Sequence, residues 1–306
     1  MRLRQAQSRT EPHWGKLMAV TYWTGGGVDD AFGTAGNWSA GLPGAGDTAI
    51  INDTSNAIVA ETYATTFEEL RVGNGFTGSL GVTANGALIT LGVTCTSVVI
   101  DTGAAVYVNA TADLVTIERT GTGDDAVRLT GDVTTLRVLG ARGTVVLGEA
   151  TALALDDLEI LGSRTATVEV QSLTTLAAAP ISMDDGRLEF RGMAATYTGQ
   201  IDCHGGRIDL YAGSYTTATF EIWGSVVVND YRDANSTIGT VNMFGGTWDA
   251  GEATADLLTI TTLKLYTDAT FDERNGLLNF AYTNGVHFAG AGTFHAATAR
   301  KITEQA

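Results

Sequence analysis

The chain has 306 residues, including 38 Gly but only 3 Pro, and charged residues make up 17%. Its formal net charge of −16 repels nucleic acid and anionic membranes, which argues against both as partners. Abundant Thr, Val and Gly favour short strands and tight turns over helices. No apolar run reaches the length of about 18 residues that a membrane span needs, and no long window has the 3.6-residue period of an amphipathic helix.

Residues 1–19 are predicted to form a basic N-terminal arm. Its positive residues outnumber its single acid, Glu11, and they are Arg2, Arg4, Arg9 and Lys16. The arm has too few apolar residues to fold alone. Two interpretations stay open, a docking arm for an acidic partner surface or an over-long start before Met18. No apolar run follows the basic residues, so we predict no secretory signal and expect either assembly inside a cell or delivery by another route.

Residues 20–64 are predicted to be an N-terminal cap with the first strands. The segment contains Tyr22-Trp23, a Gly triplet, Asn37-Trp38 and Pro43-x-x-Gly46-Asp47, followed by a strand at 48–51. A repeat array begins after it, and the first unit of such an array has an open apolar end with unpaired strand edges. Bulky aromatic side chains would cover that end. A carbohydrate-stacking site is the alternative interpretation.

Residues 65–270 contain two ladders of apolar-polar-apolar triplets at intervals of about 20 residues. The first ladder is Leu158-Glu159-Ile160, Ile181-Ser182-Met183, Ile201-Asp202-Cys203, Phe220-Glu221-Ile222, Val241-Asn242-Met243 and Leu263-Lys264-Leu265. The second is Val168-Glu169-Val170, Leu188-Glu189-Phe190, Ile208-Asp209-Leu210, Val226-Val227-Val228 and Trp248-Asp249-Ala250. Gly-rich turns separate the two strands of each unit. The pattern predicts an all-β fold, a single-stranded parallel β-helix with rungs of about 20–22 residues.

Stacking explains why such triplets repeat. The outer two residues of each triplet point inward and the middle one outward, because strand side chains alternate faces. One unit alone cannot bury its two inward-facing side chains, whereas stacked units cover them from above and below. Leu114, Leu136 and Leu158 are 22 residues apart and are expected to occupy equivalent places. Between Leu70 and Leu265 the sequence predicts about ten rungs and a narrow core.

Residues 271–306 break the repeat and are rich in aromatic side chains. We expect a C-terminal cap or a subunit contact there. The residues that carry this expectation are Phe271, Phe280, Tyr282, His287, Phe288, Phe294 and His295.

Ionisable residues offer weak candidates for chemistry. The acidic doublets are Asp29-Asp30, Asp124-Asp125, Asp156-Asp157 and Asp184-Asp185. Because most lie beside Gly or at strand starts, we interpret them as turn residues, with calcium binding or catalysis as alternatives. The four His lack metal-ligand spacing, and Cys95 and Cys203 lie too many rungs apart for a disulfide, so both should be small buried apolar residues. The sequence predicts no catalytic residue, cofactor or metal.

Two further pairs of residues each have two interpretations. Arg187 and Arg207 are 20 residues apart and should align at one turn, where they could bind an anionic sugar or pair with Glu189 and Asp209. Trp223 and Trp248 are the candidates for stacking on a glycan, and both could equally pack in the core.

The order Tyr-Trp, Asn-Trp, Pro-x-x-Gly-Asp and then a strand, with the repeat behind it, resembles the opening of repetitive β-helix proteins. These include bacterial surface proteins and structural proteins of tailed bacteriophages. The resemblance supplies no catalytic residue. With the acidic solenoid and the basic arm, it implies a non-enzymatic virion protein, a capsid decoration or cement protein assembled in the host cytoplasm. Its expected partners are the major capsid protein and copies of itself in a trimer.

The predicted partner-binding residues are those of the arm and the aromatic cap: Arg2, Arg4, Arg9, Trp14, Lys16, Tyr22, Trp23 and Trp38. Two alternative functions remain open. One is a glycan-binding adhesin or tail-spike-like protein, and the other is a secreted bacterial surface repeat protein.

Overall fold

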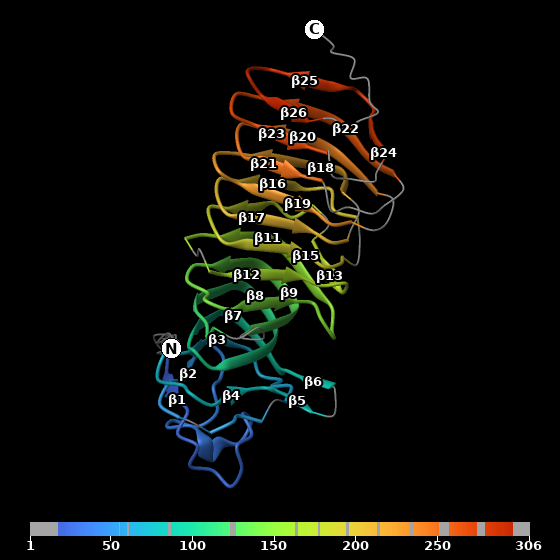
Figure 1. The fold of residues 1–306 in the computed structure, drawn as a ribbon. Helices are drawn as coiled ribbons and strands as arrows, with labels where there is room; N and C mark the ends of the chain where they lie inside the picture. The colour runs from blue at the N-terminus through green and yellow to red at the C-terminus, as the bar shows by residue number, and fades with distance from the viewer. Residues whose placement is uncertain are drawn as a thin grey trace, which may run out of the picture.

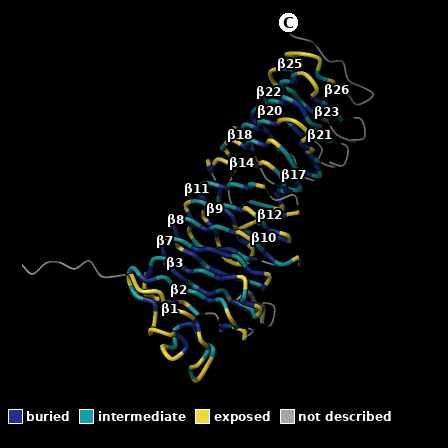
Figure 2. The backbone as a smooth tube through the Cα atoms, turned by 90° about the vertical axis from the view of Figure 1, so that its left-hand side faces the viewer, coloured by how far each residue is buried: buried dark blue, intermediate teal, exposed yellow. Residues whose placement is uncertain are grey.

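The chain forms a β-solenoid rod in a computed structural model (Figure 1). The structure describes residues 18–54, 56–59, 61–84, 87–122, 127–162, 165–176, 178–193, 196–212, 215–232, 236–250, 257–273 and 279–295. The strands are stacked along the rod from β1 near one end to β25 and β26 near the other. Figure 2 shows buried residues running along its interior. This architecture confirms the predicted all-β parallel solenoid.

Each rung has up to three sides, and the first is a continuous parallel sheet. Every strand in it pairs with the next in register, as expected for units that differ by one turn of the coil. In spatial order this first sheet contains β1 Val20–Tyr22, β2 Thr48–Ile51, β3 Phe67–Val72, β7 Leu91–Asp101, β8 Ala105–Arg119, β9 Val127–Val138, β11 Leu153–Ile160, β14 Ile181–Met183, β16 Gln200–Cys203, β18 Tyr215–Ile222, β20 Ser236–Met243, β22 Leu257–Leu265 and β25 Val286–Phe288.

A second side is formed by shorter parallel strands and by the first halves of β8 and β9, which are long enough to bend round the rod. The shorter strands of this second sheet are β4 Ser79–Leu80, β10 Thr144–Leu147, β12 Thr167–Val170, β15 Arg187–Phe190, β17 Arg207–Leu210, β19 Val227–Asp230, β21 Thr247–Asp249, β23 Thr270–Asp272 and β26 Thr293–His295.

The third side consists mainly of the middle parts of β8 and β9 and of the first halves of the other long first-sheet strands, which pair there with each other. Two separate short strands also belong to it, β13 Thr174–Thr175 and β24 Asn279–Tyr282. A two-stranded antiparallel hairpin interrupts the parallel order, with strands β5 Val82–Ala84 and β6 Ala87–Ile89. The described part of the chain also contains one short 3₁₀ helix, η1, Ala35–Asn37.

The register confirms the first predicted ladder. Ile181, Ile201 and Phe220 are direct neighbours in successive strands, and the remaining triplets follow in the same way. From β3, which holds Leu70, to β22, which holds Leu265, this sheet has ten described strands, as predicted. The expectation for Leu114 is wrong. Val115, and not Leu114, pairs with Leu136, so Leu114 faces outward.

The predicted second ladder contains one register error. Ile208 pairs with Val228, so the unit after Ile208-Asp209-Leu210 is Val228-Asn229-Asp230 and not Val226-Val227-Val228. This register places Asp230 beside Leu210 in the core, where its side chain is fully buried. The repeat is hard to recognise in the sequence at this point, because an acid stands where the neighbouring units have an apolar inward-facing residue.

The N-terminal signature folds as the predicted cap. Phe32 is fully buried among Trp23, Trp38 and Tyr63, with ring centroids 6.5, 4.9 and 5.2 Å from its own. Such aromatic clusters cover much apolar area, and here they close the first rungs. Trp38 also donates a hydrogen bond from Nε1 to the Phe32 carbonyl oxygen at 2.8 Å.

Polar residues of the same signature hold the cap to the sheet. Asn37 is fully buried, accepts a hydrogen bond from Gly27 N at 2.7 Å and donates to the Asp29 carbonyl at 2.7 Å. Beside β1, Ser39 N donates to the Tyr22 carbonyl at 2.9 Å, which satisfies an outer group of the first strand. The Gly-rich wrap therefore protects an edge that would otherwise be open to pairing with another chain.

Candidate functional site

The predicted partner-binding residues divide into three groups. Arg2, Arg4, Arg9, Trp14 and Lys16 lie outside the described residues. Tyr22 is 51% exposed on β1 and is therefore available for contact.

Trp23 and Trp38 are not available in the same way. They are only 5% and 4% exposed, because they form the aromatic core of the cap. Of the two interpretations given to these tryptophans, covering the end of the solenoid fits their burial, and sugar stacking does not.

Two acidic doublets act as turn residues. Asp29 Oδ1 accepts hydrogen bonds from Thr34 Oγ1 at 2.6 Å and from Ala31 N at 3.2 Å, and these bonds lower the pKa of the Asp29 carboxyl. Asp185 Oδ1 accepts from Gly186 N at 2.8 Å. Both patterns are the local side-chain-to-backbone bonds of tight turns.

The other two doublets do not form a recognisable site. Asp156-Asp157 belongs to β11, where burial, followed by the charge of Glu159, raises the pKa of Asp157. Asp124-Asp125 lies outside the described residues. No group of three or more His, Cys, Asp or Glu side chains suited to a metal ion occurs in the described part of the chain.

Arg187 and Arg207 align on the second sheet, as predicted, and they pair with the predicted acids. Arg187 Nη1 lies 2.8 Å from Glu189 Oε1, and its Nε lies 2.5 Å from Asp209 Oδ2. Arg207 Nε lies 2.7 Å from Asp209 Oδ1, and this hydrogen bond raises the pKa of Arg207. Glu189 and Asp209 are almost completely shielded although they point outward.

A short aromatic stack borders this paired cluster. The Arg191 guanidinium lies over the Tyr211 ring at 4.4 Å, and Tyr211 stacks on Tyr231 with centroids 4.9 Å apart. Tyr231 and Tyr211 hydroxyls also receive hydrogen bonds from Arg207 and Arg187, at 3.1 and 3.4 Å. The arginine donors are thus committed to neighbours within the fold, which favours a stabilising role over anion binding.

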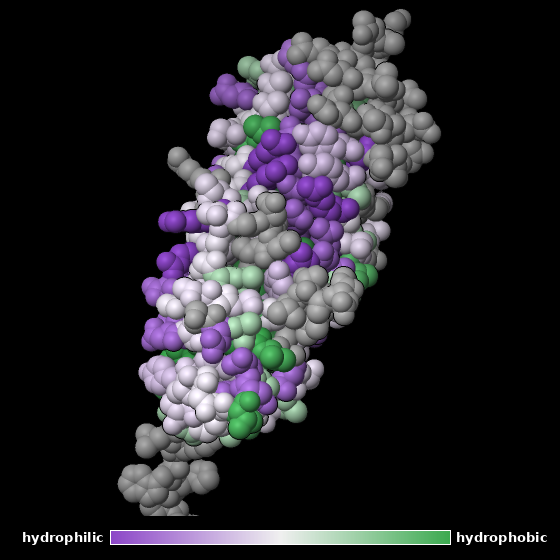
Figure 3. All heavy atoms as spheres, turned by 60° about the horizontal axis from the view of Figure 1, so that its bottom comes forward, coloured by the Kyte–Doolittle hydropathy of each residue, from purple (hydrophilic) through white to green (hydrophobic). Residues whose placement is uncertain are grey.

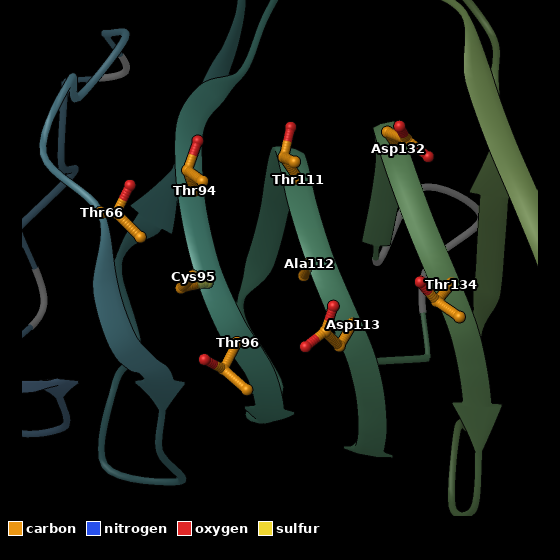
Figure 4. A pocket seen from close by; sticks show the side chains of 9 residues that line it. All are labelled: Thr66, Thr94, Cys95, Thr96, Thr111, Ala112, Asp113, Asp132 and Thr134. Atoms are coloured by element: carbon orange, nitrogen blue, oxygen red, sulfur yellow. The ribbon is translucent and has the colours of Figure 1, made fainter. Parts of the chain in front are cut away.

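A shallow hollow of about 310 Å³ lies where β7, β8 and β9 bend. Figure 4 shows two rows of its short polar side chains on these adjacent strands. The nine lining residues are Thr66, Thr94, Cys95, Thr96, Thr111, Ala112, Asp113, Asp132 and Thr134. The lining contains hydroxyls and two carboxylates but no aromatic or basic side chain, so it offers polar groups without a ring for a ligand to pack against.

The most distinctive surface is a run of stacked rings beside the first sheet. Each ring belongs to the residue that directly follows a strand: His204 after β16, Trp223 after β18, Phe244 after β20 and Tyr266 after β22. Successive centroids are 5.7, 3.9 and 4.3 Å apart, and the planes differ by 20° or less. We call these four residues the aromatic ladder.

The aromatic ladder exposes the edges of its rings to solvent, rather than their faces. The rings lie almost parallel and one above another, so each inner ring is covered on both faces by its neighbours. Trp223 is nevertheless 37% exposed, and Trp248, the other predicted stacking residue, is fully buried in the core.

Two polar columns run along the first sheet beside the aromatic ladder. The nearer, the polar ladder, contains Asp202, Glu221, Asn242 and Lys264, and the farther, the threonine ladder, contains Thr219, Thr240 and Thr262. We refer to the three columns together as the ladder face. Sequence reasoning missed this face, although each ring could have been found one position beyond a first-ladder triplet.

Contacts within the ladder face are few. Trp223 Nε1 donates to Asp202 Oδ1 at 3.1 Å, and Asn242 Nδ2 donates to Glu221 Oε1 at 2.9 Å. The second carboxylate oxygen of Glu221 and the hydroxyls of Thr219 and Thr240 have no hydrogen-bond partner within the described residues. These groups are available to a ligand.

Figure 3 shows one further face of the rod. On the described residues of that face, apolar residues form small separate spots among hydrophilic ones. In the described residues no helix is both long enough and apolar enough to cross a membrane.

Comparison with known proteins identifies no relative. No family model, curated protein or solved structure matches this chain.

Proposed function

We propose that this protein is a non-enzymatic structural protein of a tailed-phage particle, a capsid decoration or cement protein. It binds the major capsid protein as a trimer on the outside of the shell and stabilises the shell. The observation that carries the proposal is an acidic β-solenoid rod whose prominent arginine cluster is paired internally. Such a rod suits binding better than chemistry, and the sequence resemblance at residues 22–51 supports a phage origin.

Attachment uses the end of the rod at which the chain begins. Tyr22 and Val20 are 51% and 46% exposed on β1, and the basic arm precedes them in the sequence. Apolar area buried in a joint between coat subunits contributes about 25 cal/mol per Å², and basic side chains would add attraction to an acidic shell. Both contributions oppose separation of the coat subunits.

The test is reconstitution on phage heads assembled without this protein. Added protein should co-sediment with the heads and raise the temperature at which they release DNA. Replacing Arg2, Arg4, Arg9 and Lys16 together by Ala should weaken co-sedimentation, whereas Arg71→Ala on the shaft should leave it unchanged. Heads that neither retain the protein nor gain heat resistance would refute the proposal.

A further inference from the structure

We propose that the ladder face binds a neutral polysaccharide chain lying along the rod axis. This site lies in the second half of the rod, between β16 and β22, and is independent of capsid attachment at β1. The proposal rests on three properties of the face: its repeat, its chemistry and its charge.

The repeat suits a polymer. Each rung contributes one aromatic ring, one polar side chain of the polar ladder and, from β18 onward, one Thr, in register over successive strands. Neighbouring strands lie about 4.8 Å apart, a spacing similar to the length of one pyranose unit in an extended chain. A repeating ligand can therefore make the same contacts on each rung, and weak contacts add along its length.

The chemistry suits hydroxyl groups. Glu221 Oε2 can accept a hydrogen bond from a sugar hydroxyl, and Thr219 and Thr240 can donate or accept one. Bonds to a carboxylate are the stronger kind, since one partner is charged. The ring edges of Trp223 and Phe244 carry partial positive charge and present C–H groups, which suit the oxygens and the apolar patches of a sugar.

The charge excludes other polymers that use aromatic side chains. A nucleic acid could stack on rings, but in the polar ladder the two acids, Asp202 and Glu221, outnumber the single lysine, Lys264, and the chain has a net charge of −16, so phosphate is repelled. Anionic polysaccharides are disfavoured for the same reason.

The second aromatic stack supplies an internal comparison. Arg191, Tyr211 and Tyr231 also stack along the axis, but their polar groups are bonded to each other and to the paired cluster. Removing Tyr231 therefore disturbs a stack without touching the ladder face. Tyr231→Ala is the matched control for Trp223→Ala.

The experiment is affinity electrophoresis of the full chain in native gels. The gels contain dextran, xyloglucan, galactomannan or mixed-linkage β-glucan, with polygalacturonate as the anionic comparison. We expect retardation by at least one neutral polysaccharide. Trp223→Ala should weaken the interaction about tenfold, a size typical of losing one aromatic contact. Thr240→Val, which keeps the β-branched shape and removes the hydroxyl, should weaken it severalfold without lowering the melting temperature.

Three results would overturn the proposal. The first is no retardation by any of the four neutral polysaccharides. The second is equal loss of binding in Trp223→Ala and Tyr231→Ala, which would indicate an indirect effect of stability. The third is retardation by polygalacturonate alone. None of these outcomes bears on capsid attachment, so the two proposals can fail separately.

Discussion

Arg232 and Asp230 form a bidentate ion pair inside the rod. Arg232 Nη2 lies 2.5 Å from Asp230 Oδ2, and Arg232 Nε lies 2.7 Å from Asp230 Oδ1. Both residues are shielded from solvent, and Asp230 occupies the place that Leu210 fills one rung earlier. Within the described residues, a core of stacked apolar side chains thus contains this charged pair, and its partners satisfy each other where water cannot reach them.

We expect loss of either partner of this pair to be costly. Asp230→Ala should lower the free energy of unfolding by about 3–5 kcal/mol, because it leaves a buried guanidinium without its counter-charge. The double variant Asp230→Leu/Arg232→Met replaces the pair by apolar groups and should regain most of that loss. Urea titrations followed by circular dichroism measure both changes, read from the midpoint at unchanged slope. If the double variant is as unstable as the single one, the charge pair is not the cause.

A second prediction contrasts a buried acid with an exposed one. Arg187→Ala removes hydrogen bonds from Glu189 and Asp209, which are 1% and 0% exposed, and should cost about 2–3 kcal/mol. Arg71→Ala breaks the pair with Glu118, in which both side chains are about 40% exposed, and should cost less than about 1 kcal/mol.

Thermal unfolding of the two variants tests that contrast. Raised salt should also weaken the Arg71–Glu118 contribution more than that of Arg187, because exposed pairs are screened. If the two variants lose the same free energy of unfolding, the arginine cluster stabilises the fold no more than an ordinary surface ion pair does.

The sequence predicts the repeat well but predicts its exceptions poorly. Triplets such as Ile201-Asp202-Cys203 reveal their register because inward places are apolar and period-2 alternation is strict. Arg187 and Arg207 could be aligned for the same reason. The rung that contains Asp230 was assigned the wrong register, because an acid is not expected at an inward-facing position. The ion pair with Arg232 is what allows Asp230 to be buried there.

The positions of the ladder-face rings follow from the repeat, but their stacking could not be predicted from the sequence, for a different physical reason. His204, Trp223, Phe244 and Tyr266 occupy the first position of a turn, where no alternation of faces applies. Only the stacking of successive turns brings their rings to within 3.9–5.7 Å of each other. One sequence alone does not show how closely the turns of successive rungs lie above one another.

Gly131 offers a third prediction. It lies within β9 at φ +108°, where a Cβ atom would stand 2.1 Å from the Ala110 carbonyl oxygen. Gly131→Ala should therefore cost at least about 2 kcal/mol, from the left-handed backbone and the contact. Gly103→Ala is the control, since nothing lies within 4 Å of its Cβ position and its φ is not positive. Comparable stability of the two variants in urea would contradict this account of the strand bend.

The last prediction concerns the two thiols and alkaline pH. Burial raises the pKa of Cys95 and of Cys203 to about 12, and their side chains are 5% and 0% exposed. In the folded protein neither thiol should react with a disulfide reagent at pH 8, whereas both should react in guanidinium chloride, because the thiolate is the nucleophile. Rapid reaction of the native protein would show that the thiols are accessible.

The same shifts set the sign of a pH effect. An unfolded thiol ionises near pH 9 and a folded one only near 12, so between these values the unfolded state binds fewer protons. Stability is then fully present below about pH 9 and falls as pH rises, by about 1.4 kcal/mol per thiol for each pH unit. The variant Cys95→Ala/Cys203→Ala should show a shallower decline in urea titrations from pH 8 to 11. A decline of equal slope in both proteins would assign the alkaline loss to other groups.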